Sequence, residues 1–268
     1  MNLKDMMDLY YEEGLTRELT SARVCQDIVL KAISEGPLNR NVTVKGGVVM
    51  RSITNNNRRA TRDIDLDFIH YSLSDESIKA FVDKLNCIEG IRIEIEGEIK
   101  ELKHQDYNGK RIGIVIKDKY GNAVRSKIDI GVHKHFDIEQ EIYCFDVCMD
   151  DNGASLLKNG NEQSFVEKLR SLLIFGPNSR RYKDVYDMYY LKDDSDEQKM
   201  CSIIQSLIFD DLGMRESSKV DITKRISDTF ADEQYLKRIS DSRQRWIDDD
   251  IHDIAEGIVE YISNLELR

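Results

Sequence analysis

The sequence predicts an α+β protein with a mixed, largely antiparallel sheet flanked by helices, followed by an all-helical C-terminal domain. Short runs of alternating apolar residues recur until about residue 150, whereas helical spacing dominates after it. Tyr120-Gly121-Asn122 separates two of these runs and is typical of a hairpin turn. The polar segment Asp150-Asp151-Asn152-Gly153 marks the change, and it divides the expected domains, 1–152 and 153–268.

The elements expected in the first domain follow from apolar periodicity and from capping and turn residues. Val24, Ile28 and Ile33 have helical spacing, and Ser74 is a good helix cap. Alternation is clearest in the run that starts at Ile91. We therefore expect helices over 1–35 (in two pieces), 47–53 and 74–85, and strands over 39–44, 58–68 (in its last part), 91–96, 111–119, 124–132 and 141–147.

The second domain is expected to contain helices only. Gly176-Pro177-Asn178-Ser179 is a clear stop and restart between two of them. The expected helices cover 162–175, 180–191, 197–209, 219–230 and, in pieces, 232–265.

Composition bounds the function. Of the 268 residues, 40% are hydrophobic and 33% are charged, which is typical of a polar chain with a real core. No apolar run is as long as a membrane span, and the N-terminus lacks the regions of a signal peptide, so we expect a cytoplasmic protein. The formal net charge of −11 argues against a general nucleic-acid binder and favours metal cations. Five scattered cysteines argue against a disulfide framework.

An acidic strand, Asp63-Ile64-Asp65-Leu66-Asp67-Phe68, carries the main chemical signal. Residues two apart share a face of a strand, so the three acids lie opposite the three apolar residues. Such acids repel one another unless a base, water or a metal intervenes. Asp67 is interpreted either as an acid that supports this site or as a strand-end residue.

The acids suit a magnesium site. Mg²⁺ prefers oxygen ligands and keeps several waters, so Asp63 and Asp65 can serve two ions as in two-metal phosphoryl transfer, with Mn²⁺ as a substitute. Asp129, between two isoleucines of another strand, is the candidate third ligand and the candidate base for an acceptor hydroxyl. A salt bridge to a lysine or arginine is the alternative for Asp129.

A diglycine precedes the acidic strand. Glycine lets the backbone approach a phosphate closely, and the N–H groups at a helix N-terminus bind anions. Gly46-Gly47 taken alone is more often a turn, but Arg51 and the acidic strand follow it. This order favours binding of a nucleotide by Gly46, Gly47 and Arg51.

A second charged cluster lies in the helical domain. Arg180, Lys183, Asp184 and Asp187 share one helix face, and Lys168 lies on the preceding helix. A solvated, salt-bridged helix face is one interpretation. The other is a basic surface for triphosphate, with acids that orient its cations.

These segments resemble the nucleotidyltransferases of the AbiEii/AbiGii type, which are DNA polymerase β-like enzymes, many of them toxins of toxin–antitoxin and abortive-infection systems. The resemblance covers roughly residues 42–190. Its motifs are Lys45-Gly46-Gly47-Val48-Val49-Met50-Arg51, Arg62-Asp63-Ile64-Asp65-Leu66-Asp67, Glu167-Lys168-Leu169 and Arg180-Arg181-Tyr182-Lys183-Asp184-Val185-Tyr186-Asp187.

The resemblance implies a polymerase β-like fold for the first domain and transfer of a nucleotide from an NTP to an acceptor, which is tRNA for some members. It also implies a cognate antitoxin and a helical domain that contributes to the active site. Carried over by motif, the roles are triphosphate binding by Gly46 and Gly47, metal binding by Asp63 and Asp65, phosphate contact by Lys168, and completion of the site by Lys183, Asp184 and Asp187.

The leading hypothesis is therefore a magnesium-dependent nucleotidyltransferase toxin acting on RNA. A catalytically idle polymerase β-like module that works by binding proteins is one alternative. A metal-dependent nuclease or phosphatase is another, since it shares the carboxylates but has less use for the diglycine.

Overall fold

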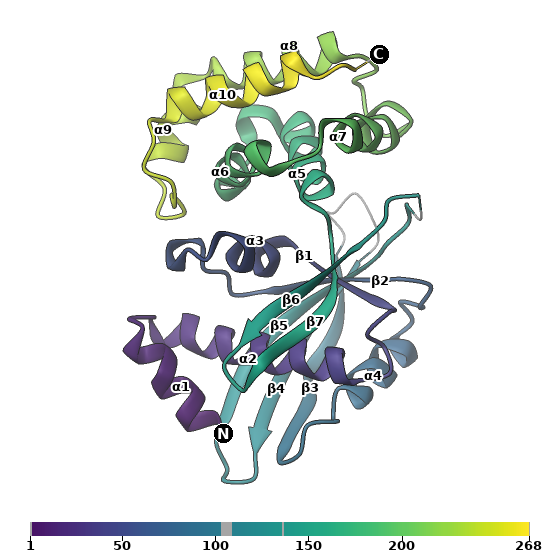
Figure 1. Cartoon of the computed structure of the whole chain (residues 1–268), viewed down its shortest axis with the longest axis vertical. Helices are drawn as coiled ribbons and strands as arrows, with labels where there is room; N and C mark the ends of the chain where they lie inside the picture. The colour runs from purple at the N-terminus through teal and green to yellow at the C-terminus, as the bar shows by residue number, and fades with distance from the viewer. Residues whose placement is uncertain (1, 103–108, 136, 268) are drawn as a thin grey trace. The chain divides into compact units, whose positions relative to one another are not determined.

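The computed structural model describes residues 2–102, 109–135 and 137–267 (Figure 1). The chain divides into two compact units, Met1–Asn159 and Gly160–Arg268. This division lies later than the boundary expected after residue 152.

The first unit is built on a seven-stranded sheet of order β3-β4-β5-β2-β1-β7-β6 (Figure 1). Strands β1 and β7 are parallel, as are β2 and β5, and the other four described pairings are antiparallel. The expected mixed, largely antiparallel sheet is confirmed. The strands are β1 (Val42–Lys45), β2 (Ile64–Phe68), β3 (Ile91–Leu102), β4 (Gly109–Asp118), β5 (Ala123–Val132), β6 (Glu141–Val147) and β7 (Asp150–Lys158).

Strand β7 was not expected from the sequence, and it accounts for the later boundary. The register between β6 and β7 shifts after Phe145, so the polar segment that was interpreted as a domain boundary is an irregularity inside this hairpin. Gly153 lies there with a φ of +69°, and a Cβ on it would be 2.7 Å from the carbonyl oxygen of Phe145. A bulge therefore has the composition of a loop while it belongs to a strand.

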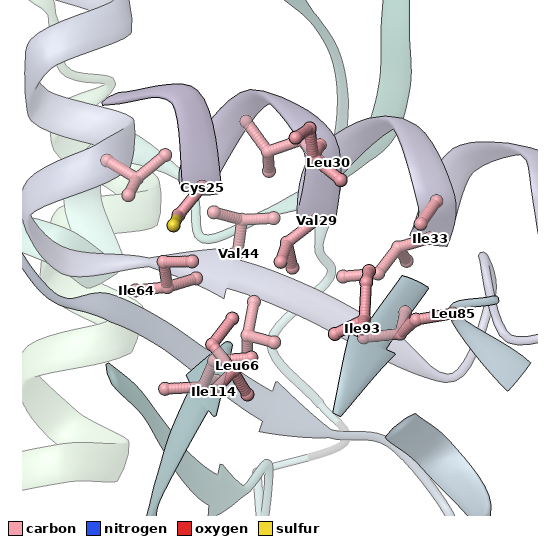
Figure 2. Packing of buried hydrophobic residues seen from close by; sticks show 14 of the residues in the cluster. Cys25, Val29, Leu30, Ile33, Val44, Ile64, Leu66, Leu85, Ile93 and Ile114 are labelled. Atoms are coloured by element: carbon pink, nitrogen blue, oxygen red, sulfur yellow. The ribbon is translucent and has the colours of Figure 1, made fainter. Parts of the chain in front are cut away.

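Helices cover one face of the sheet and enclose the core. They are α1 (Leu3–Glu12), α2 (Arg17–Glu35), α3 (Gly46–Thr54) and α4 (Asp75–Lys84), with a 3₁₀ turn at Asn57–Arg59. Figure 2 shows the inner face of α2 above the apolar side chains of the central strands. The side chains labelled there are Cys25, Val29, Leu30, Ile33, Val44, Ile64, Leu66, Leu85, Ile93 and Ile114.

This core fixes the orientation of the acidic strand. Ile64, Leu66 and Phe68 of β2 are fully buried. Each such side chain contributes about 1.5–3 kcal/mol by burial, so β2 cannot turn over without a large loss of stability. The intervening acids consequently project from the opposite face of the sheet.

The second unit is helical, as expected. Its 3₁₀ turn Gly176–Asn178 confirms the stop between the first two helices, and a π-helical turn, Gln205–Phe209, ends α7. In the described part of the chain, no helix is both long enough and apolar enough to cross a membrane. The helices are α5 (Asn161–Phe175), α6 (Tyr182–Leu191), α7 (Glu197–Ile204), α8 (Lys219–Phe230), α9 (Glu233–Ser240) and α10 (Ile251–Asn264).

Candidate active site

Four charged residues form a row across the centre of the sheet. Asp65 on β2 pairs in register with Lys45 on β1 and with Asp129 on β5. Asp129 pairs in turn with Arg111 on β4. Directly opposed residues share a face, so Lys45, Asp65, Asp129 and Arg111 make a charged row of signs plus, minus, minus, plus.

Arg111 holds Asp129 in a bidentate ion pair. Its Nε and Nη2 donate to Oδ1 and Oδ2 of Asp129, each at 2.6 Å. The hydrogen bond to Asp129 is the main reason that the pKa of Arg111 is raised. The salt bridge considered for Asp129 is therefore present. A bidentate arginine uses one lone pair of each oxygen and leaves another, so this pairing does not by itself remove Asp129 from a metal site.

Asp67 is held by Lys45, diagonally across the β1–β2 pair. The Nζ of Lys45 lies 2.8 Å from Oδ2 of Asp67, and both side chains are buried. Oδ1 of Asp67 is buried without a hydrogen-bond partner among the residues that the structure describes. Asp67 is therefore the counter-ion of Lys45.

Asp65 lies at the centre of the row. Its pKa is raised to about 6, first by burial and also by the charges of Asp129 and Asp63, while Lys45 and the backbone N–H of Gly47 act in the opposite direction. Asp63 comes immediately before β2 and is partly exposed. Like charge is therefore concentrated on Asp63 and Asp65, which is a condition that a bound cation relieves.

The diglycine turn packs directly against two of these elements. Gly46 has a φ of +63°, and a Cβ on it would lie 2.3 Å from Oδ2 of Asp65. A Cβ on Gly47 would lie 2.4 Å from Oγ1 of Thr61. The structure therefore gives both glycines a packing reason, since α3 can begin this close to Asp65 only without side chains at the turn.

The side chains available as donors determine which metal ion the site fits. Within the described residues, no group of three or more His, Cys, Asp or Glu side chains is arranged to hold a metal. Arg111 and Lys45 engage two of the acids, which leaves Asp63 and Asp65. Two carboxylates suit Mg²⁺, which keeps waters and substrate oxygens as its other ligands.

Arg51 lies elsewhere in the first unit. It projects from α3 into a cavity that residues of α1 and α2 also line. None of the acids of the candidate site lines this cavity. The structure therefore groups Gly46, Gly47 and the acids together but does not place Arg51 with them.

The cluster expected in the helical unit is largely buried. Nζ of Lys168 lies 3.3 Å from Oδ1 of Asp184 and 3.0 Å from Oδ2 of Asp187. Asp187 is fully buried and accepts a hydrogen bond from Trp246 Nε1 at 3.1 Å. Arg181 Nε donates to Oδ2 of Asp184 at 2.6 Å. Lys168 is thus a buried cation between two carboxylates.

Two other residues of this cluster differ in exposure. Arg180 is exposed, and Lys183 is half-buried on the first turn of α6. Arg180 precedes α6, so it does not share a helix face with the other three residues as the sequence predicted, and Asp184 and Asp187 belong to the interior of the unit.

Sequence reasoning missed Arg111, the function of Lys45, and the polar role of Trp246. Arg111 had a usable signal, because a hairpin centred on Tyr120-Gly121 places it opposite Asp129. For Lys45, the sequence showed only that it precedes the diglycine, and it gave no sign of the ion pair with Asp67. Trp246 gave no local signal, because its bond to Asp187 spans 59 positions of the chain.

Comparison with known proteins supports the resemblance drawn from the motifs. Residues 28–246 match the family described as "Nucleotidyl transferase AbiEii toxin, Type IV TA system". No curated protein matches the chain. Among solved structures, the chain is similar to an antigenic nucleotidyltransferase-like protein from Paracoccidioides brasiliensis, with 11% identity, a TM-score of 0.46, and coverage of 80% of this chain and 92% of that one.

Proposed function

We propose that this chain, which belongs to the AbiEii family of nucleotidyltransferase toxins of type IV toxin–antitoxin systems, transfers a nucleotide from a nucleoside triphosphate to an RNA acceptor in a magnesium-dependent reaction. The first candidate acceptor is tRNA. The observation that carries the proposal is the packing of Gly46, at the start of α3, against the central acid Asp65.

Asp63 and Asp65 are the residues that would hold the magnesium ions. Bound magnesium would neutralise the charge of the triphosphate oxygens. The N–H of Gly47 already donates to Asp65, and the other backbone N–H groups of the first turn of α3 are suited to bind a phosphate, because a helix N-terminus leaves such donors without intrahelical partners. Gly46 is required for this turn, since its φ of +63° is unfavourable for other residues.

Asp129 has two roles open to it. Arg111 fixes the carboxylate in one orientation, and each oxygen keeps a second lone pair. Those lone pairs suit either a third metal ligand or a base for the acceptor hydroxyl. In either role Arg111 positions Asp129.

The proposal keeps the roles that the family resemblance gives to Lys168, Lys183 and Asp184. Because Lys168 is buried between two acids, loss of activity on its substitution needs a stability control. A cytoplasmic location, where triphosphates and tRNA occur, and control by a cognate antitoxin belong to the same proposal.

The test is incubation of the protein with each α-labelled nucleoside triphosphate, magnesium and total tRNA. We expect label in the RNA with the wild-type protein, and none with Asp63→Asn or after chelation of magnesium. Asp83→Asn, on the exposed face of α4, is the matched control and should transfer label normally. Transfer that is equal in Asp63→Asn and wild type would overturn the assignment.

A catalytically idle binding module is the second candidate, because Arg111 and Lys45 already neutralise two of the acids. Calorimetric titration with triphosphate, with and without magnesium, separates the two. An idle module shows no metal-dependent binding of nucleotide. Appearance of cleaved RNA or free phosphate in the same assay would instead indicate a nuclease or phosphatase.

A further inference from the structure

A cavity of about 290 Å³ lies within the first unit, apart from the candidate active site. Its walls come from α1, α2, α3, the loop between α3 and β2, and the β6–β7 turn. The volume is near the lower end for small-molecule sites. Its lining mixes leucines with asparagines and charged residues, so it is neither a simple packing defect nor a uniformly polar groove.

Two residues in the lining have hydrogen-bonding groups that are buried without partners in the described part of the chain. Gln26 is fully buried, and its Nε2 donates to the carbonyl oxygen of Thr61 at 3.0 Å. That bond fixes the orientation of the amide, because an oxygen cannot donate to Thr61. Oε1 of Gln26 is consequently turned away from Thr61, and it has no donor.

Arg51 is the second residue. Its Nε and Nη2 are both buried, and neither has an acceptor among the described residues. Leaving a buried donor unsatisfied is unfavourable, and more so for a charged group. Such a cost is tolerated more easily where a ligand removes it.

Arg23, the other arginine in the lining, has partners for its guanidinium group and serves as a comparison. Arg23 pairs with Asp27 at 3.3 Å and donates to the hydroxyl of Tyr10 and to the carbonyl of Asp146. No acid stands in this relation to Arg51 in the part of the chain that the structure describes. The acids Glu13 and Asp146 also line the cavity, but both are exposed.

We propose that this cavity binds a phosphate group, either free or as part of a small phosphomonoester. The phosphate oxygens accept hydrogen bonds from Arg51, and its remaining O–H, present in part near neutral pH, donates to Oε1 of Gln26. A carboxylate supplies the acceptors but no donor. Phosphate therefore complements both residues, and this site goes beyond the nucleotidyl transfer proposed above.

The cavity is connected to the candidate active site through one residue. Thr61 accepts from Gln26 by its carbonyl oxygen, and its side chain occupies the space beside Gly47. Gly47 in turn donates its backbone N–H to Asp65. Occupancy of the cavity is therefore expected to restrain the loop against which the diglycine turn packs.

The test measures binding of inorganic phosphate and of ribose 5-phosphate by calorimetry, in EDTA and without nucleotide. We expect both to bind the wild-type protein, and at least tenfold weaker binding by Arg51→Gln. Arg40→Gln, an exposed arginine in the turn before β1, is the control and should bind as the wild type does. Tighter binding of ribose 5-phosphate identifies a phosphomonoester as the ligand, and equal binding identifies free phosphate.

Absence of binding by the wild-type protein at millimolar phosphate would overturn the proposal, as would equal binding by Arg51→Gln or full competition by acetate. If Arg51→Gln does not fold, the side-chain amide signals of Gln26 in the wild-type spectrum provide the test. They should shift on addition of phosphate, and unchanged signals contradict the site. These measurements need no metal or triphosphate, so they stand or fall independently of nucleotide transfer.

Discussion

At the scale of single residues, Asp65 is the acid of the candidate site whose ionised form is most strongly disfavoured by its surroundings. Its carboxylate is partly buried, lies against Gly46 and faces two further acids. A position of this kind is unfavourable for stability and is suited to binding a cation. The same residue is therefore expected to show opposite effects in stability and in activity.

The pH dependence of stability tests this directly. The pKa of Asp65 is about 6 in the folded protein, and it is about 4 in an unfolded chain. The folded state thus holds the proton more tightly, and this group's contribution to stability is present below pH 4 and lost as the pH rises to 6. We expect Asp65→Asn to be about 2 kcal/mol more stable than wild type at pH 7, and similar to it at pH 4. Urea unfolding at both values measures this, and a difference independent of pH would contradict it.

Arg111 gives a second prediction. Replacing it with glutamine leaves Asp129 poorly solvated without its partner, which we expect to lower the free energy of unfolding by about 1–3 kcal/mol. Arg125→Gln is the matched control, because Arg125 forms a similar but exposed pair with Glu96. Its loss should cost less than about 1 kcal/mol. Equal losses in the free energy of unfolding for the two substitutions would show that the Arg111–Asp129 pair stabilises the fold no more than an exposed ion pair does.

At the scale of elements, the turn from β1 into α3 is the critical connection. Gly46→Ala adds both backbone strain and a collision with Asp65. Gly121→Ala adds strain alone, since Gly121 has a φ of +87° and open space around it. We expect about 1–2 kcal/mol of destabilisation for Gly121→Ala and clearly more for Gly46→Ala. Denaturant unfolding compares them, and equal losses would mean that Asp65 moves away without cost.

The elements also show what the sequence can and cannot predict. Period-two and helical patterns located most helices and strands, and the hairpin turn at Gly121 was recognised, but the pairing of Arg111 with Asp129 that follows from this turn was not predicted. The parallel pairings of β2 with β5 and of β1 with β7 join distant segments, and no local pattern reveals them. Strand β7 was missed because its bulge at Gly153 has the composition of a turn.

As with the helices and strands, the sequence predicted the local arrangement of the candidate-site residues but not the contacts between distant ones. Alternation along β2 was enough to place its acids on one face, and the structure places Gly46 of the diglycine against one of them, Asp65. The counter-ion Lys45 could be assigned only with the sheet order, because it lies on the strand next to that of Asp67, whereas the hairpin turn alone is enough to place Arg111 opposite Asp129. Arg51 was assigned to the nucleotide site only because it follows the diglycine closely in the sequence. In the structure, α3 directs its side chain into the cavity beside α1 and α2.

At the scale of the whole molecule, each unit has its own buried charge cluster. In the helical unit, Lys168→Met leaves Asp184 and Asp187 without their shared cation, which we expect to cost about 3–5 kcal/mol. Hydrogen exchange should therefore rise in α5 and α6. Lys224→Met, on the exposed side of α8, should leave exchange unchanged. Unchanged exchange in Lys168→Met would indicate that this lysine is kept for ligand contact and not for stability.

The central claim is that Asp63 and Asp65 bind metal together with a triphosphate. The most direct measurement is electron paramagnetic resonance titration of Mn²⁺ in the presence of a nucleoside triphosphate. We predict that the wild-type protein binds the metal–nucleotide complex and that Asp63→Asn combined with Asp65→Asn abolishes this binding, while Asp83→Asn does not. Binding of the complex by the double variant with wild-type affinity would contradict the account.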